Sequence, residues 1–227
     1  MPRIPVATLK QYLTEDEVKT LLDFVRWRAT RKGAARRYVT DRAMVETFLF
    51  SAVRNAELRA LNFSALPAYH QTMVLAVVNG KGGKSRDVPI PEQLAELLLD
   101  YAVNVRGATA DSDPETPLFV GRKQGGVARR IICQTITARI KNVGRDCAKA
   151  CADPNSQFHG RDGNFTGKNY LFPHKLRYVA ATRFYEESEH NLRATQLYLG
   201  HSNVAVTSRY LQQGTEKLSE IAKNIYV

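Results

Sequence analysis

The chain has 227 residues, of which 44% are hydrophobic and 24% are charged, which excludes a disordered tail, a collagen-like fibre and a disulfide scaffold. Its 33 Lys and Arg residues outnumber 22 Asp and Glu residues, so the formal net charge is +11 and the expected partner is a polyanion such as nucleic acid. Three cysteines indicate a reducing compartment. Because neither a bilayer-spanning apolar run nor a signal peptide is evident, we expect a cytoplasmic protein without membrane contact.

The N-terminal half predicts two helices and a β-hairpin. Thr14 and Glu17 have the spacing of a capping box, in which a hydroxyl and a carboxylate satisfy the first amides of a helix. A glycine-rich turn over 79–84 separates two strand-like runs. The expected bounds are 14–29 and 40–60 for the helices, 73–78 and 86–90 for the hairpin strands, and 63–66 for a possible third strand.

The C-terminal half predicts helices joined by polar loops. Pro91 suits the first position of a helix, residues 107–117 form a proline-bearing loop, and residues 152–167 form an insertion rich in Asp, Asn, Gly and Pro. The expected fold class is therefore mainly α with a small antiparallel β-sheet (α+β), without a linker that would divide it. The expected helices span 91–105, 131–151, 174–188, 192–199, 203–211 and 214–224.

Three short motifs carry groups that can act together on a phosphodiester. An Arg-x-x-Glu pair falls in a largely apolar helix, a His-x-x-Arg pair starts a helix directly after a proline, and a Leu-Gly-His sequence precedes a tyrosine by nine residues. Guanidinium forks grip phosphate oxygens, imidazoles bond them or move protons, and a phenol attacks phosphorus when cations stabilise the developing charge. The residues are Arg54 and Glu57, His174 and Arg177, and His201 and Tyr210.

In order and spacing these motifs resemble those of the tyrosine recombinase (phage integrase-like) family. The family pattern is Arg-x-x-Glu-Leu, then a hairpin of the form Gly-Lys-Gly-x-Lys-x-Arg-x-Val-Pro, then His-x-Leu-Arg, Leu-Gly-His and a tyrosine. Any one of these motifs is weak evidence, but five in the same order are strong evidence. They occur here at 54–58, 80–89, 174–177, 199–201 and 210.

The resemblance implies the catalytic-domain fold of that family and a site-specific recombinase that needs no cofactor or metal. Tyr210 would attack the scissile phosphate, form a 3′-phosphotyrosyl link and free a 5′-hydroxyl. Arg54 and Arg177 would hold the phosphate oxygens, and Lys81 at the hairpin tip would protonate the leaving oxygen. The resulting reaction integrates, excises or inverts DNA.

The resemblance also implies supporting roles for further residues. His174 and His201 would position the phosphate and exchange protons, and Glu57 would lie behind the site. Double-stranded DNA would lie in a basic groove, with base readout from the helix around residues 134–145. The residues expected to contact DNA are Lys84, Arg86, Arg129, Arg130, Arg139 and Lys141.

The chain differs from the family pattern at its N-terminus, where the usual core-binding domain is not evident. We expect residues 1–12 to be a lead-in and residues 13–227 to be the catalytic domain, of a recombinase that is either short or truncated. The amphipathic tail over 212–227 either docks on a neighbouring protomer, giving dimers or tetramers on DNA, or packs on its own domain. Accessory DNA-bending proteins are possible partners.

Other functions remain open at this point. A type IB topoisomerase would use the same phosphotyrosine chemistry, a non-catalytic regulator would only bind DNA, and an RNA-binding module would share the basic charge. Lys84 follows a glycine as in a phosphate-binding loop, but the first glycine of that motif is replaced by Val78. Cys147 and Cys151 with His159 do not have metal-ligand spacing.

Overall fold

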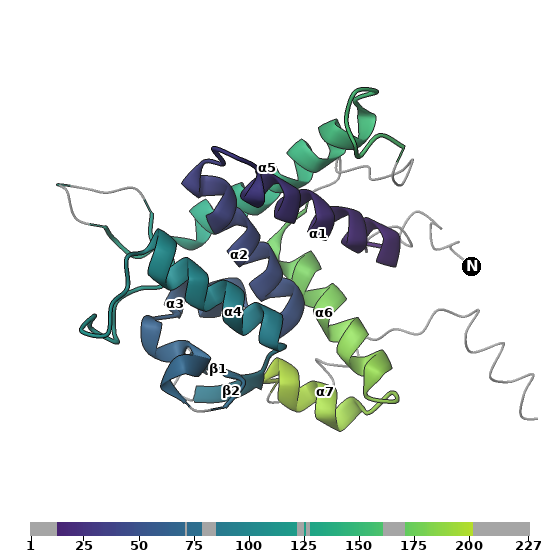
Figure 1. Ribbon diagram of the computed structural model, residues 1–227. Helices are drawn as coiled ribbons and strands as arrows, with labels where there is room; N and C mark the ends of the chain where they lie inside the picture. Colours follow the sequence, from purple (N-terminus) through teal and green to yellow (C-terminus); the bar gives the residue numbers. More distant parts are fainter. Residues whose placement is uncertain are drawn as a thin grey trace, which may run out of the picture. The chain divides into compact units, whose positions relative to one another are not determined.

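The protein is built mainly of helices, with one small sheet (Figure 1). A computed structural model describes residues 13–70, 72–78, 85–121, 125, 128–160 and 171–201. The chain forms two compact units, and the boundary between them falls at Ala180 and Ala181, inside helix α6 (Pro173–Glu187). The predicted fold class, mainly α with a small antiparallel sheet, is confirmed. No helix among the described residues has the length and apolar character needed to cross a membrane.

The first helix, α1 (Glu15–Thr30), begins at the predicted capping box. The Thr14 hydroxyl accepts the Glu17 amide at 3.1 Å, and the Glu17 carboxylate accepts the Thr14 amide at 2.7 Å. Both partners satisfy amides that have no acceptor inside the helix. The buried face of α1 packs on α2 (Arg36–Ser51).

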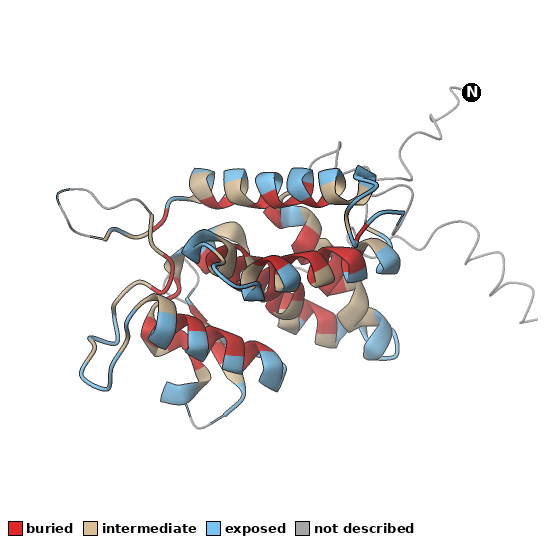
Figure 2. Ribbon diagram, turned by 45° about the horizontal axis from the view of Figure 1, so that its top comes forward, coloured by how far each residue is buried: buried red, intermediate tan, exposed pale blue. Residues whose placement is uncertain are grey.

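Helix α2 forms the centre of the first unit. It packs against α1, against α4 (Glu92–Asp100) and against α5 (Cys133–Ala152) (Figure 1). Most of its residues from Thr40 onward are buried, polar ones such as Glu46 included. Figure 2 shows that buried residues lie where helices face one another, whereas the outer faces are exposed. Burial on nearly all sides explains why α2 has little amphipathic pattern in its sequence.

The single helix predicted over 40–60 is wrong, because the chain breaks it into α2 and the short helix α3 (Asn55–Ala60). Ala52 ends α2 in the left-handed conformation, with φ of 48°. Arg54 then takes the extended conformation of an N-cap. A left-handed alanine costs energy that glycine would avoid, so tertiary contacts maintain this turn.

The sheet consists of β1 (Val74–Val78) and β2 (Ser85–Pro89), paired antiparallel from Val74 with Pro89 to Val78 with Ser85. The hairpin prediction is confirmed. Its buried side chains are Leu75, Val77 and Val88.

The predicted third strand at 63–66 is wrong. Residues Phe63–Ala65 form a 3₁₀ turn, η2, which a second 3₁₀ turn, η3 (Pro67–Tyr69), follows. The amides of Phe63 and Ser64 donate to carbonyls of the 107–117 loop rather than to a strand. Because that loop satisfies these backbone groups, nothing draws the segment into the sheet.

Helices α4 and α5 also belong to the first unit. Helix α4 continues into a π-helical turn, η4 (Tyr101–Val105), so the prediction of 91–105 is confirmed. Helix α5 confirms the prediction of 131–151 to within two residues. A Cβ added at Gly144 of α5 would lie 2.6 Å from Cβ of Leu171, so only glycine permits this close approach.

The described part of the second unit contains the end of α6 and helix α7 (Leu192–Leu199). The bounds of α7 match the prediction of 192–199, and those of α6 differ from the prediction of 174–188 by one residue at each end. The Asn191 side chain caps α7 by accepting the Ala194 amide at 2.9 Å. The rings of Phe184 and Tyr198 stack with centroids 4.1 Å apart. The helices predicted at 203–211 and 214–224 lie outside the described residues.

Candidate active site

The centre of the candidate site is Glu57, a carboxylate that is only 2% exposed. Arg86 of β2 grips it with both terminal nitrogens, at 2.8 and 3.0 Å. Arg54 reaches it with its backbone amide at 2.7 Å and with a guanidinium nitrogen at 2.6 Å. Arg177 of α6 lies 3.8 Å from the same carboxylate. One acidic side chain therefore gathers arginines from three separate segments.

The electrostatics of this cluster keep Glu57 ionised. Burial acts to raise its pKa, but hydrogen bonds from Arg86 and from the Arg54 amide outweigh burial. With the two guanidinium charges they lower the pKa to about 2. Three guanidinium groups against one carboxylate leave a formal charge of 3 − 1 = +2. The cluster can therefore attract an anion such as a phosphodiester.

Arg177 is positioned by the break between α2 and α3. It is 2% exposed and donates from Nη1 to the carbonyl oxygen of Ala52. The left-handed turn at Ala52 thus supplies an acceptor for one catalytic candidate. Two residues later the same turn supplies Arg54, whose side chain is 37% exposed and can meet a ligand.

His174 lies one helical turn before Arg177, at the exposed start of α6. Partial desolvation of its imidazole and the charge of Arg177 both lower its pKa below 6.5. The neutral ring, which these effects favour, has one nitrogen able to donate and the other able to accept. Together with Asn55 and Lys141 it lines an open cavity of about 450 Å³.

A second cavity of about 390 Å³ continues from the first along α5, and Gln134 and Lys141 line it. Asn55 ties the start of α3 to this helix, donating to the Cys133 carbonyl at 3.2 Å and to the Thr137 hydroxyl at 3.1 Å. The exposed face of α5 therefore adjoins the arginine cluster through Asn55. This is the helix from which base readout is expected.

Ion pairs to two buried residues, Arg28 and Asp41, hold α5 against the first two helices. Arg28 of α1, only 5% exposed, pairs with Asp41 of α2 at 3.1 Å and with Asp146 of α5 at 2.8 Å. Arg139 of α5 also pairs with Asp41, at 2.8 Å. The Arg28 guanidinium lies over the Tyr38 ring at 4.4 Å. We call these side chains the Arg28 network.

The residues expected to contact DNA differ in their surroundings. Arg86 is engaged with Glu57 and Arg139 with Asp41, while Arg130 donates to the carbonyls that end α3. Arg129 and Lys141 are exposed and form no ion pair with any residue that the structure describes. Lys84 lies outside the described residues.

The remaining candidates lie in the second unit or outside the described residues. His201, in the second unit, is 8% exposed and follows Gly200, whose φ of 63° ends α7. The Gln196 side chain donates to the His201 carbonyl at 2.9 Å. Lys81 and Tyr210 lie outside the described residues. The structure thus brings together Arg54, Glu57, His174 and Arg177 of the predicted set.

Two members of the cluster were not recognised from the sequence. Arg86 was assigned to DNA, although strand alternation places it on the same side of β2 as the buried Val88 and so indicates an inward direction. The Ala52 carbonyl has no signal in the sequence, because its role depends on a backbone turn.

Comparison with known proteins gives consistent findings. The model of the phage integrase family matches residues 11–217. The chain is similar to a tyrosine recombinase XerC of Chromohalobacter salexigens, with 31% identity over 80% of this chain and 51% of that protein. It is similar to a XerC of Vibrio atlanticus, with 32% identity over 80% of this chain and 50% of that protein. The chain spans about half the length of the curated relatives it matches.

Solved structures give the same result for the fold. The crystal structure of XerA recombinase matches with a TM-score of 0.66 and 26% identity, over 99% of this chain and 66% of that one. The Tn1549 transposon integrase in complex with transposon right end DNA matches with a TM-score of 0.64 and 19% identity, over 99% of this chain and 66% of that one. At 19% identity the likeness concerns the fold alone.

Proposed function

Because the chain belongs to the phage integrase family, we propose that it is a site-specific DNA recombinase that cleaves and rejoins strands through a 3′-phosphotyrosyl intermediate. The observation that supports this most directly is the meeting of Arg54 and Arg177 at the buried Glu57. Two guanidinium groups held from two helices can grip the two non-bridging oxygens of one phosphodiester. The proposed substrate is double-stranded DNA, and the proposed place of action is the cytoplasm.

In the proposed reaction the arginines bind the phosphate and stabilise its pentavalent transition state. Glu57 and Arg86 hold Arg54 in place, so the charge facing the phosphate is preorganised. His174 bonds a phosphate oxygen or exchanges a proton with it. His201 has the same proposed role from the second unit.

The proposed bond changes balance without a cofactor. The Tyr210 oxygen forms a bond to phosphorus and loses its proton to a neighbouring base, while the bond from phosphorus to the 5′-oxygen breaks. Lys81 gives a proton to that oxygen, which leaves as a 5′-hydroxyl. Attack by a 5′-hydroxyl of another strand reverses these steps, because the phosphotyrosyl bond conserves the energy of the original linkage.

The face of α5 is the proposed DNA surface. Arg129 and Lys141 are exposed there or beside it, and Gln134 lines the adjoining cavity. Arginine and lysine neutralise phosphates, whereas a glutamine amide can read the edge of an adenine. Arg86, Arg130 and Arg139 would support this surface through their protein partners and carry part of its positive potential. Assembly into dimers or tetramers on DNA, through the 212–227 tail, belongs to the same proposal.

A nicked suicide substrate tests the proposal. We would incubate the chain with a pool of duplexes of randomised sequence, each nicked near the centre so that the cleaved fragment diffuses away and religation fails. A covalent protein–DNA adduct that maps to Tyr210, and that Tyr210→Phe abolishes while binding persists, is the expected result. An adduct at Tyr198, or relaxation of supercoiled plasmid without sequence preference, would contradict the proposal.

A further inference from the structure

The outer face of α4 is acidic, although the protein as a whole is basic. Residues 87–105 contain four carboxylates and no Lys or Arg, although the whole chain has a net charge of +11. All four carboxylates are exposed, on β2 and along the outer face of α4. They are Asp87, Glu92, Glu96 and Asp100. Because DNA phosphates are repelled by such a surface, this face is unsuited to the proposed substrate.

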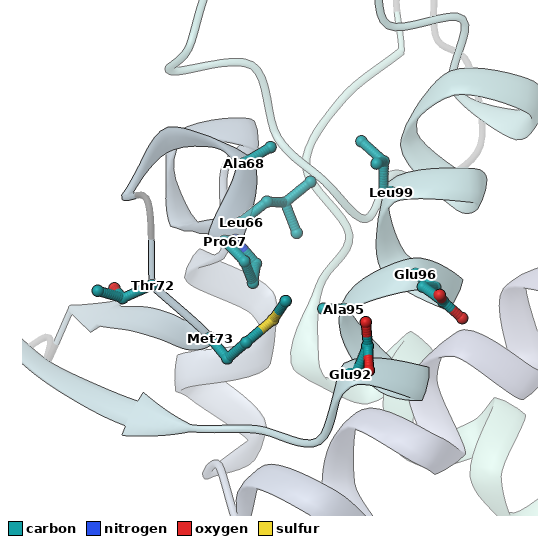
Figure 3. Close-up of a pocket in the computed structure, with 9 residues that line it drawn as sticks. All are labelled: Leu66, Pro67, Ala68, Thr72, Met73, Glu92, Ala95, Glu96 and Leu99. Carbon is teal, nitrogen blue, oxygen red and sulfur yellow. The ribbon is translucent and has the colours of Figure 1, made fainter.

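An apolar groove lies along the same face (Figure 3). Its volume is about 340 Å³, and its walls come from the η2–η3 segment, from the two residues before β1, and from α4. Leu66 and Ala95 are buried in its floor, whereas Met73 and Leu99 are 51% and 47% exposed at its edges. We call this feature the α4 groove.

The apolar surface extends beyond the groove itself. Val103 lies one turn after Leu99 and is 46% exposed, and Tyr69 at the other side is also 46% exposed. Large apolar side chains that gather on one face, rather than being scattered singly, mark a surface that binds another molecule. Met73 adds an unbranched side chain that adapts to different partners.

Two carboxylates border the groove. Glu92 and Glu96 line it from α4, one helical turn apart (Figure 3), and both residues are exposed. Neither forms an ion pair with a residue that the structure describes. Two carboxylates one turn apart match two ammonium or guanidinium groups at the same spacing on a second helix.

We propose that the α4 groove docks a positively charged amphipathic helix of a partner protein. Its apolar side chains enter between Met73 and Leu99, and its Lys or Arg side chains pair with Glu92 and Glu96. This is the mode in which a helix lies in a hydrophobic groove, with anchors at one-turn intervals. The tail of a second copy fits less well, because residues 212–227 contain two Lys and two Glu and so carry no net charge.

A pair of synthetic peptides tests the charge requirement on the full chain. The probe is a fluorescent helical peptide with leucines on one face and lysines beside them, and its counterpart has glutamate in place of every lysine. Fluorescence anisotropy is expected to show binding of the lysine peptide with Kd on the order of 10 μM and none of the glutamate peptide. Methyl NMR signals of Met73 and Leu99 are expected to shift.

Matched variants localise the binding. The double substitution Glu92→Gln with Glu96→Gln is expected to weaken the lysine peptide about tenfold, as two exposed ion pairs are lost. Leu99→Asp is expected to weaken it by more. The control variants remove equally exposed groups of α6 and α7, by Glu186→Gln with Glu187→Gln and by Leu197→Asp, and are expected to change nothing.

Three outcomes would overturn the inference: equal binding of both peptides, NMR shifts away from the groove, or tighter binding of a peptide with the sequence of 212–227. The last result would make a second copy the occupant. The inference does not rest on the proposed recombinase activity. A chain that formed no DNA adduct would still bind the lysine peptide, and Leu99→Asp is expected to leave adduct formation unchanged.

Discussion

Replacing Glu57 with glutamine tests the arginine cluster most directly. The substitution keeps the shape of the side chain but removes the one negative charge among three guanidinium groups. Glu57 has its pKa lowered from 4.5 to about 2. A difference of that size corresponds to about 3 kcal/mol of folding free energy, since each pKa unit is worth about 1.4 kcal/mol.

The pH dependence of this effect has a definite sign. A carboxyl group whose pKa is lowered in the folded state stabilises the protein above its unfolded pKa, here 4.5, and loses that effect as pH falls toward 2. Glu57→Gln is therefore expected to lower the free energy of unfolding by about 3 kcal/mol at pH 7. The difference from the parent protein should shrink as pH falls below 4.5, because the unfolded chain then binds a proton at Glu57 that the folded chain does not bind until the pH nears 2.

Urea denaturation followed by circular dichroism, at several pH values between 7 and 3, measures the free energy of unfolding and its dependence on pH. The control is Glu187→Gln on the exposed face of α6, for which a change within about 0.5 kcal/mol is expected. The reasoning is refuted if Glu57→Gln unfolds at the parent's urea midpoint at pH 7. It is also refuted if the destabilisation is the same at pH 3 as at pH 7.

Three further predictions follow from other contacts. Arg177→Lys keeps the charge but loses the planar fork directed at the Ala52 carbonyl and the phosphate, so DNA adduct formation should fall by about 100-fold while circular dichroism stays unchanged; full activity would contradict the role. Gly144→Ala should lower stability by about 1 to 3 kcal/mol, because the added Cβ meets Leu171 at 2.6 Å, and thermal denaturation would reveal an unchanged Tm if this were wrong. Lys141→Ala should weaken DNA binding and reduce the slope of log affinity against log salt by about 0.9, measured by anisotropy; an unchanged slope would remove Lys141 from the DNA surface.

Local signals in the sequence predicted most of the helices and the hairpin. The capping box at Thr14 and Glu17 located α1 because both partners lie within one turn. The break at Ala52 was missed because alanine favours helix, and only the surrounding contacts hold it left-handed. The prediction of a third strand was wrong because contacts distant in the sequence decide that segment as well. The carbonyls that accept from the Phe63 and Ser64 amides lie in a loop about fifty residues away.

In the candidate site, too, the sequence predicted the residues that lie in local motifs and missed the contacts between distant segments. Arg54, Glu57 and Arg177, which the structure brings together, could be proposed from the sequence because they lie in short motifs of fixed spacing. The engagement of Arg86 with Glu57 and of Arg130 with the end of α3 was missed, because both contacts join residues far apart in the chain. A basic residue in a motif shows that positive charge is needed there, but burial and partners decide whether it meets a ligand or the protein itself.

The Arg28 network has a practical consequence for handling this protein. Mobile ions screen charges that face water, whereas Asp41, which pairs with Arg28 of α1 and with Arg139 of α5, has a side chain that is only 11% exposed. Concentrated electrolyte should therefore strip bound nucleic acid from the helix face that carries Lys141 without loosening the anchoring of that helix. A high-salt wash during purification would therefore remove nucleic acid and leave the proposed DNA surface on α5 folded.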